Sequence, residues 1–292
     1  MDVGLLMLAG GFAAGVFGSL LGLGGGVLIV PLLTLVFGLD LRSAVGVSLV
    51  CVIMTSSAAA GVYLERHVAN LRLGMSLELF TAIGALIGAS IAFLIDERVL
   101  SVLFAALLGY VAFSMVRGAS RETDGTDDVE AGTEAAPGPL VTTVLGESGA
   151  ARRVVDTRSG FLASVAGPGY AVRNLGTGIV GSTGAGVVSA LLGIGGGTIK
   201  VPLMNLAMGV PMRVAIATSN LMIGITAAAS AVVYLLRGEI DPYVAGPTAI
   251  GVFIGATVGS RVAHRIPLRY LRWLFVAVLL YTAVQMLLRA VS

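Results

Sequence analysis

Two nearly identical glycine-rich stretches lie far apart in this chain. The first, LGLGGGVLIVPL, runs from Leu21 to Leu32, and the second, LGIGGGTIKVPL, runs from Leu192 to Leu203. A glycine inside a helix costs about 1 kcal/mol relative to alanine, so three in a row predict that a helix stops at each stretch. The only lysine of the chain, Lys200, lies just beyond the second glycine triplet.

The sequence around these stretches is strongly apolar. The 292 residues are 57% hydrophobic and 12% charged, whereas a soluble domain usually has about 25% charged residues. Apolar runs of about 20 residues, enough to cross a bilayer, are separated by short charged segments. The runs are continuous rather than alternating, which favours helices over a membrane barrel. We therefore expect an all-α polytopic membrane protein.

The two halves of the chain match at a constant offset of 171 positions. Identical residues coincide at Pro31 and Pro202, Arg42 and Arg213, Ser48 and Ser219, Thr55 and Thr226, Tyr63 and Tyr234, Gly84 and Gly255, and Phe104 and Phe275. A repeat of this size indicates an internal duplication, which in membrane proteins is typical of transporters with a site between the repeats. The predicted organisation is a first transmembrane repeat at 1–117, a linker at 118–174 and a second repeat at 175–292.

Each repeat is predicted to contain a glycine-broken first segment and three ordinary spans. The broken segments are 4–37 and 176–209, and the spans are 43–64, 74–95 and 99–117 in the first half and 214–236, 243–263 and 269–289 in the second. If the broken segment crosses the membrane, the repeats are parallel; if it dips in and returns, they are inverted. Basic residues favour the cytoplasmic side, and the re-entrant alternative gathers more of the arginines on one side. The arginines therefore favour inverted repeats with a cytoplasmic linker.

The linker differs in composition from the repeats. Acidic residues crowd its first part among glycine, threonine and alanine, and PGP follows at 137–139. Such a segment buries too little apolar surface to order by itself, so we expect a solvated linker with a short hairpin at about 140–155. It is either a simple tether between the repeats or a regulatory segment.

The glycine triplets are the first candidates for a binding site. A helix break leaves free backbone N–H groups at the start of the next half-helix, where the helix dipole favours negative charge. Glycine has no side chain, so an oxyanion approaches the backbone closely. We predict two facing backbone cradles for an anionic substrate, formed by Gly24, Gly25, Gly26, Gly195, Gly196 and Gly197.

Two charged residues inside apolar runs are further candidates. Lys200 follows Gly197 by three residues, and its counterpart in the first half is Ile29. An ammonium group at membrane depth is costly unless it serves a polar cavity or a partner, although a lysine also snorkels to the surface. Glu78, opposite Ala249, is a candidate carrier of a coupling proton, or else lies in the headgroup region.

Polar side chains in the spans complete the candidate site. The repeat-related hydroxyls of Ser48 and Ser219 and of Thr55 and Thr226, together with Asn220, are predicted to assist anion binding. The alternative is that they hold membrane helices together.

Several other classes of site lack support. The chain has one cysteine, Cys51, and two histidines, so we expect no metal centre and no cofactor. GTGIVG at 176–181 opens an apolar helix without a preceding strand, which argues against a dinucleotide site. The formal charge of +2 and the absence of a basic stripe argue against nucleic-acid binding.

The paired GLGGGVLIVPLL and GIGGGTIKVPLM motifs, each followed by a span that begins near Arg42 or Arg213, resemble the sulfite exporter TauE/SafE family of membrane transporters. The resemblance covers both halves but not the linker. It implies secondary transport of a small sulfur-containing anion, sulfite or an organosulfonate, across the cytoplasmic (inner) cell membrane, with protons or another ion as the coupling partner. The alternatives are a passive anion channel, and a membrane enzyme or signalling subunit that acts through the linker.

Overall fold

The computed structural model describes residues 2–20, 25–65, 69–122, 172–262 and 268–291, and every regular element in them is helical. The elements of the first half are α1 (Asp2–Leu20), α2 (Gly26–Pro31), the π-helical η1 (Leu32–Val36), α3 (Leu41–Glu65), α4 (Leu71–Ala92) and α5 (Glu97–Glu122). Those of the second half are α7 (Leu175–Leu192), α8 (Gly197–Pro202), η2 (Leu203–Ala207), α9 (Met212–Leu236), α10 (Pro242–Val262) and α11 (Leu268–Val291). The predicted all-α class is confirmed.

Within the described residues, six helices are long and apolar enough to cross a membrane: α3, α4, α5, α7, α9 and α10. The apolar stretches 3–19, 26–36 and 273–288 in other helices are shorter. The predicted spans agree with the observed helices to within a few residues, except that α5 continues to Glu122, five residues into the segment assigned to the linker. The rest of that linker through 171, with its predicted hairpin, lies outside the described residues. The chain is a multi-pass membrane protein.

The broken segment of the second half forms a helical hairpin. The backbone N–H of Arg173, before α7, donates to the carbonyl of Met208, after η2, at 3.0 Å. A Cβ added to Gly181 of α7 would meet Leu203 of η2, so the two arms pack along each other. The segment therefore enters and leaves at the same end of the bundle. Proline has no N–H to donate, and in both halves the helix continues beyond Pro31 or Pro202 as a wider π-helical turn.

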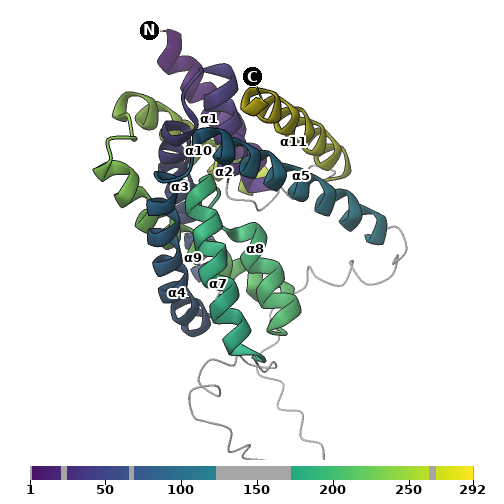
Figure 1. Cartoon of the computed structure of the whole chain (residues 1–292). Helices are drawn as coiled ribbons and strands as arrows, with labels where there is room; N and C mark the ends of the chain where they lie inside the picture. Colours follow the sequence, from purple (N-terminus) through teal and green to yellow (C-terminus); the bar gives the residue numbers. More distant parts are fainter. Residues whose placement is uncertain (1, 21–24, 66–68, 123–171, 263–267, 292) are drawn as a thin grey trace, which may run out of the picture.

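The two repeats pack mainly against each other. Helix α1 packs against α10, and the equivalent pair, α7 and α4, packs in the same way. Helices α3 and α9, which are equivalent to each other, are also in contact, as are α5 and α11. Figure 1 shows α5 and α11 side by side beside the other helices. Glycines allow the closest contacts: a Cβ at Gly15 would lie 2.3 Å from the carbonyl oxygen of Val252, and one at Gly84 would lie 2.2 Å from that of Thr183. These glycines suit close helix packing.

Helices α3 and α9, which are equivalent in the two repeats, run in opposite directions. The hydroxyl of Ser43 at the start of α3 donates to Glu239, just after α9 ends, at 2.9 Å. Further along α3, the hydroxyl of Ser56 donates to the backbone carbonyl of Asn220, in the first half of α9. This antiparallel course favours the inverted arrangement of the repeats, and their orientation in the bilayer stays a prediction.

Candidate functional site

The second glycine turn separates α7 from α8. Gly193, Gly195 and Gly196 have φ angles of 68°, 81° and 74°, in the left-handed region that glycine adopts without strain. Gly197 then begins α8, and Gly195, Gly196 and Gly197 are all buried. The glycine sequence therefore reverses the chain inside the protein rather than at its surface.

The first glycine turn meets the second. Gly25 has a φ angle of 74° and Gly26 begins α2, while Gly24 lies outside the described residues. A Cβ added to Gly26 would lie 2.5 Å from the carbonyl oxygen of Gly193. The two turns thus touch at the centre of the bundle, where a side chain on Gly26 has no room.

The two repeat-related serines bond differently. Ser48 on α3 donates to the carbonyl of Gly193 at 2.8 Å, and its Oγ lies 3.3 Å from the carbonyl oxygen of Gly26, so it ties the two turns together. The buried Oγ of Ser219 on α9 has no hydrogen-bond partner among the described residues, and a Cβ added to Gly197 would lie 3.7 Å from it. At these equivalent positions, therefore, one hydroxyl is hydrogen-bonded and the other has no hydrogen-bond partner among the described residues.

Ser189, near the end of α7, is a candidate that the sequence reasoning missed. Its Oγ is buried and has no hydrogen-bond partner in the part of the chain that the structure describes, and a Cβ added to Gly196 would lie 3.5 Å from it. A buried polar atom without a partner is uncommon in native proteins and calls for a reason. The repeat gave no signal for this residue, because its counterpart in the first half is Gly18.

Lys200, Glu78 and Thr226 form a buried polar cluster. The Nζ atom of Lys200 lies 2.6 Å from Thr226 Oγ1 and 3.3 Å from Glu78 Oε2. The hydroxyl of Thr226 lies 2.6 Å from Glu78 Oε1 and 3.0 Å from the carbonyl oxygen of Met222. The three side chains are 1%, 3% and 0% exposed, so neither Lys200 nor Glu78 reaches the surface. Within the bundle the two opposite charges neutralise each other.

Three elements from both repeats supply this cluster. Lys200 comes from α8, just past the second glycine turn, Glu78 from α4 and Thr226 from α9. The sequence reasoning singled out all three but proposed separate roles for Lys200 and Glu78. In the structure, Lys200 and Glu78, which are 122 positions apart in the sequence, form one ion pair.

The remaining candidates are held within their own helices by the bonds that the structure shows. Thr55 donates to the carbonyl of Val52 at 3.0 Å, and the side-chain amide of Asn220 donates to that of Ile216 at 3.1 Å. The backbone carbonyl of Asn220 also accepts the Ser56 hydroxyl of α3. In this conformation both residues contribute to helix structure and packing.

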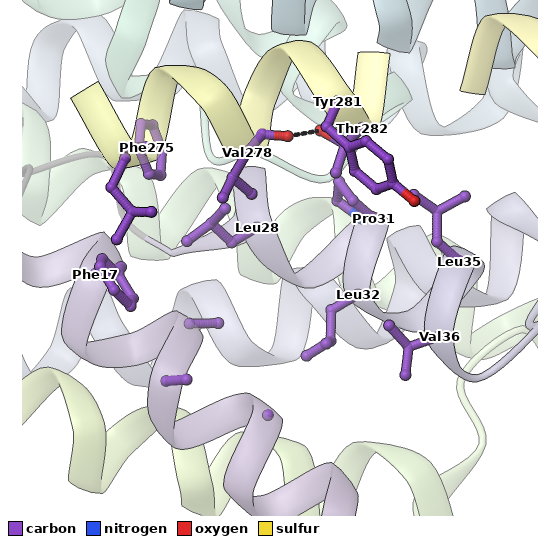
Figure 2. Close-up of a pocket in the computed structure, with 14 residues that line it drawn as sticks. Phe17, Leu28, Pro31, Leu32, Leu35, Val36, Phe275, Val278, Tyr281 and Thr282 are labelled. Carbon is purple, nitrogen blue, oxygen red and sulfur yellow. Dashed lines mark hydrogen bonds between the residues drawn. The ribbon is translucent and has the colours of Figure 1, made fainter. Parts of the chain in front are cut away.

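An apolar surface cavity lies away from the cluster. It measures about 430 Å³ and lies between α1, α2 with η1, and α11; Figure 2 shows Phe17 and Leu28 on one side and Phe275 and Val278 on the other. A second cavity of about 340 Å³ is lined in part by Asp40, Glu97 and Arg98. Neither of these two cavities is lined by a described glycine of the two turns or by Lys200, Glu78 or Thr226, and these three side chains are at most 3% exposed.

Comparison with known proteins identifies similar sequences. The family described as Sulfite exporter TauE/SafE matches residues 7–286 of this chain. A probable membrane transporter protein YunE of Bacillus subtilis is 25% identical over 272 residues, which are 89% of each chain. A probable membrane transporter protein MamO of Paramagnetospirillum magneticum is 28% identical over 98% of this chain, which spans 44% of that protein. No solved structure matches the chain.

Proposed function

Because the chain belongs to the sulfite exporter TauE/SafE family, we propose that it is a secondary transporter that moves a small sulfur-containing anion, coupled to an ion gradient. The family and the relatives indicate a membrane transporter rather than an enzyme. Sulfite and organosulfonates are the proposed cargo. The proposed location is the cytoplasmic membrane, with the linker on the cytoplasmic side.

The buried ammonium group of Lys200 is the observation that carries the proposal. Lys200 is 1% exposed and belongs to the half-helix that follows the second glycine turn. Ionisable side chains inside membrane proteins are costly and in general serve substrate or ion pathways. Once it is released from Glu78, a buried ammonium group favours an anion over a neutral or cationic substrate.

The neighbouring donors suit an oxyanion. Thr226 already lies within hydrogen-bond distance of Lys200, and the unpartnered hydroxyls of Ser189 and Ser219 flank Gly196 and Gly197 on the same turn. An oxyanion has several acceptor atoms and gains from such converging donors. We assign anion binding to Lys200 and Thr226, with these serines and the glycine turn assisting once α8 and α4 separate.

A flux assay in reconstituted vesicles tests the proposed function. Wild-type protein is expected to accumulate at least one of sulfite, sulfate, thiosulfate, sulfoacetate and taurine, and an uncoupler is expected to abolish the accumulation. Lys200→Met removes the charge and is expected to abolish flux, whereas Ile29→Met changes the equivalent position of the first half and is expected to leave flux intact.

Three results would contradict the proposal. Unchanged flux in Lys200→Met removes the assigned role of that residue. Equilibration without accumulation identifies a passive channel. Loss of flux on deletion of 122–157, with the helices still folded, indicates a protein that acts through its linker rather than a transporter core.

A further inference from the structure

The charges and hydrogen bonds of Lys200 and Glu78 are balanced within their own cluster. Lys200 donates to Glu78 Oε2 and to Thr226, and the Thr226 hydroxyl donates to Glu78 Oε1, so both carboxylate oxygens have a donor. With Lys200 protonated and Glu78 ionised, the cluster has no net charge. A neutral cluster is the least costly state for two ionisable groups inside a bilayer.

The helices around Glu78 offer little else to balance its charge. Helix α4 packs against α7, which has no titratable side chain, and against α9, which has Arg213 in its first turn and Tyr234 near its end. The Tyr234 hydroxyl donates to a backbone carbonyl of α7 at 3.2 Å. On α4 itself, Arg72 is exposed. Among the described side chains named here, which do not include that of Arg213, Lys200 is the one that contacts Glu78.

An anion that binds Lys200 competes with Glu78 for the same ammonium group. If Glu78 stays ionised, one positive charge faces two negative charges and the cluster becomes net negative. Removing one partner from a buried ion pair is strongly destabilising, because the other charge is left without compensation. The anion therefore binds favourably only when the carboxylate is neutralised at the same time.

A single proton on Glu78 removes this conflict. The proton comes from a hydronium ion on the side from which the anion binds. One O–H bond of the hydronium ion breaks as the O–H bond of the neutral carboxylic acid forms, and a water molecule is released. The Thr226 hydroxyl then no longer has to donate to Glu78 and is free to donate to the bound anion. Lys200 is left to bind the anion, and the loaded cluster of ammonium, acid and singly charged anion is neutral.

We propose that this ion pair couples one proton to one singly charged sulfonate in the same direction, with no net charge moved. The inference rests on the proposed function, since it takes Lys200 as the anion ligand. The loaded carrier crosses as ammonium, carboxylic acid and anion. The empty carrier returns with Lys200 and Glu78 paired again, so both forms are neutral inside the membrane.

Methanesulfonate is the probe, because it does not titrate in the pH range of the assay. Purified full-length protein is reconstituted into vesicles that contain a pH-sensitive dye. We expect an inward proton gradient to drive methanesulfonate uptake, with one proton entering per anion. A potential imposed with potassium and valinomycin is expected to leave the wild-type rate unchanged.

Glu78→Gln separates coupling from binding. The variant keeps Lys200 charged, so its loaded form is neutral but its empty form carries a positive charge. We expect the ratio of uptake with and without the proton gradient to fall to about one. An inside-positive potential is then expected to speed uptake. Glu78→Asp is expected to restore part of the gradient dependence, and Glu239→Gln, which removes a carboxylate elsewhere, is expected to behave as wild type.

The outcomes distinguish this inference from the proposed function. Methanesulfonate uptake that a potential drives without proton entry overturns the coupling and leaves anion transport standing. The same holds if methanesulfonate fails to enter vesicles in which another sulfur anion does. If none of the tested sulfur anions moves, the proposed function and the coupling fall together. The wild-type measurement decides the question even if Glu78→Gln does not fold.

Discussion

The two repeats hold different residues at equivalent buried positions. In the second half, Lys200 and Thr226 meet Glu78 from the first repeat. The positions related to these by the repeat hold Ile29, Thr55 and Ala249, and they are also buried, at 0%, 5% and 5% exposed. The cluster of Lys200, Glu78 and Thr226 therefore carries two opposite charges, whereas the positions related to it by the repeat have no ionisable side chain.

This difference shows what duplication kept and what it did not. Both halves keep the glycine turn, the proline and the π-helical turn that follows it. These features depend on the backbone, which each half needs to form its hairpin. Charged side chains occur at one of the two sets of equivalent positions, so we expect the two sets to differ in what they bind. We expect the anion at the second half and a packing role for the first.

The largest effect is expected when the charged cluster is broken. Glu78→Ala leaves Lys200 buried without its partner and is expected to lower the free energy of unfolding by about 3–5 kcal/mol. The double variant Glu78→Ala with Lys200→Ile copies the pair Ala249 and Ile29 of the first half. It is expected to recover most of that loss but to remain inactive.

Unfolding of the purified proteins in detergent, followed by circular dichroism, measures this difference, and vesicle flux measures activity. A double variant as unstable as Glu78→Ala would show that the apolar pair found in the first half cannot replace the ion pair in the second half. A double variant that still transports would remove the pair from the mechanism.

An intermediate effect is expected at the two glycine turns. Gly25→Ala places a side chain at a φ angle of 74° and is expected to cost about 1–2 kcal/mol in backbone strain alone, because its Cβ would meet nothing closer than 3.4 Å. Gly195→Ala adds a Cβ 2.5 Å from Ile223 and 2.8 Å from Val52. Overpacking is expected to add about 1–3 kcal/mol.

The shift of the unfolding midpoint in denaturant compares the two glycine variants. Equal losses for Gly25→Ala and Gly195→Ala would mean that the second turn is no more tightly packed than the first.

The smallest effect is expected for the related serines. Ser48→Ala removes the hydrogen bond that ties the two turns and is expected to lower the free energy of unfolding by about 0.5–1.5 kcal/mol. Ser219→Ala removes a buried hydroxyl that has no partner, so it is expected to leave stability unchanged or slightly higher. Sulfite flux is expected to fall in Ser219→Ala more than in Ser48→Ala. The reverse order in either measurement would contradict the distinction between a structural and a binding serine.

Much of the fold could be predicted because its signals are local or repeated. Continuous apolar runs fix helix positions, and a glycine triplet ends a helix whatever surrounds it. The constant offset between halves made the helices of one half a check on those of the other. Whether the broken segment crosses the membrane or returns to the side it entered could not be predicted from the glycine triplet alone. The same glycines suit a crossing segment and a hairpin.

The candidate site was predicted less completely. Lys200 and Glu78 stood out separately because charge is rare in apolar runs. Their pairing had no signal, because they lie in different repeats and the equivalent positions in the other half are Ile29 and Ala249. Ser189 was missed for a similar reason, since its counterpart in the first half is Gly18 and the repeat does not mark it.

By itself, the sequence determined the helices, their breaks and the duplication, because these follow from hydropathy and backbone preference along the chain. The tertiary structure alone decided that α4 brings Glu78 to Lys200 and that Ser48, not Ser219, closes the glycine turns. Such contacts depend on how helices from opposite halves pack, and packing is a property of the folded bundle rather than of any one segment.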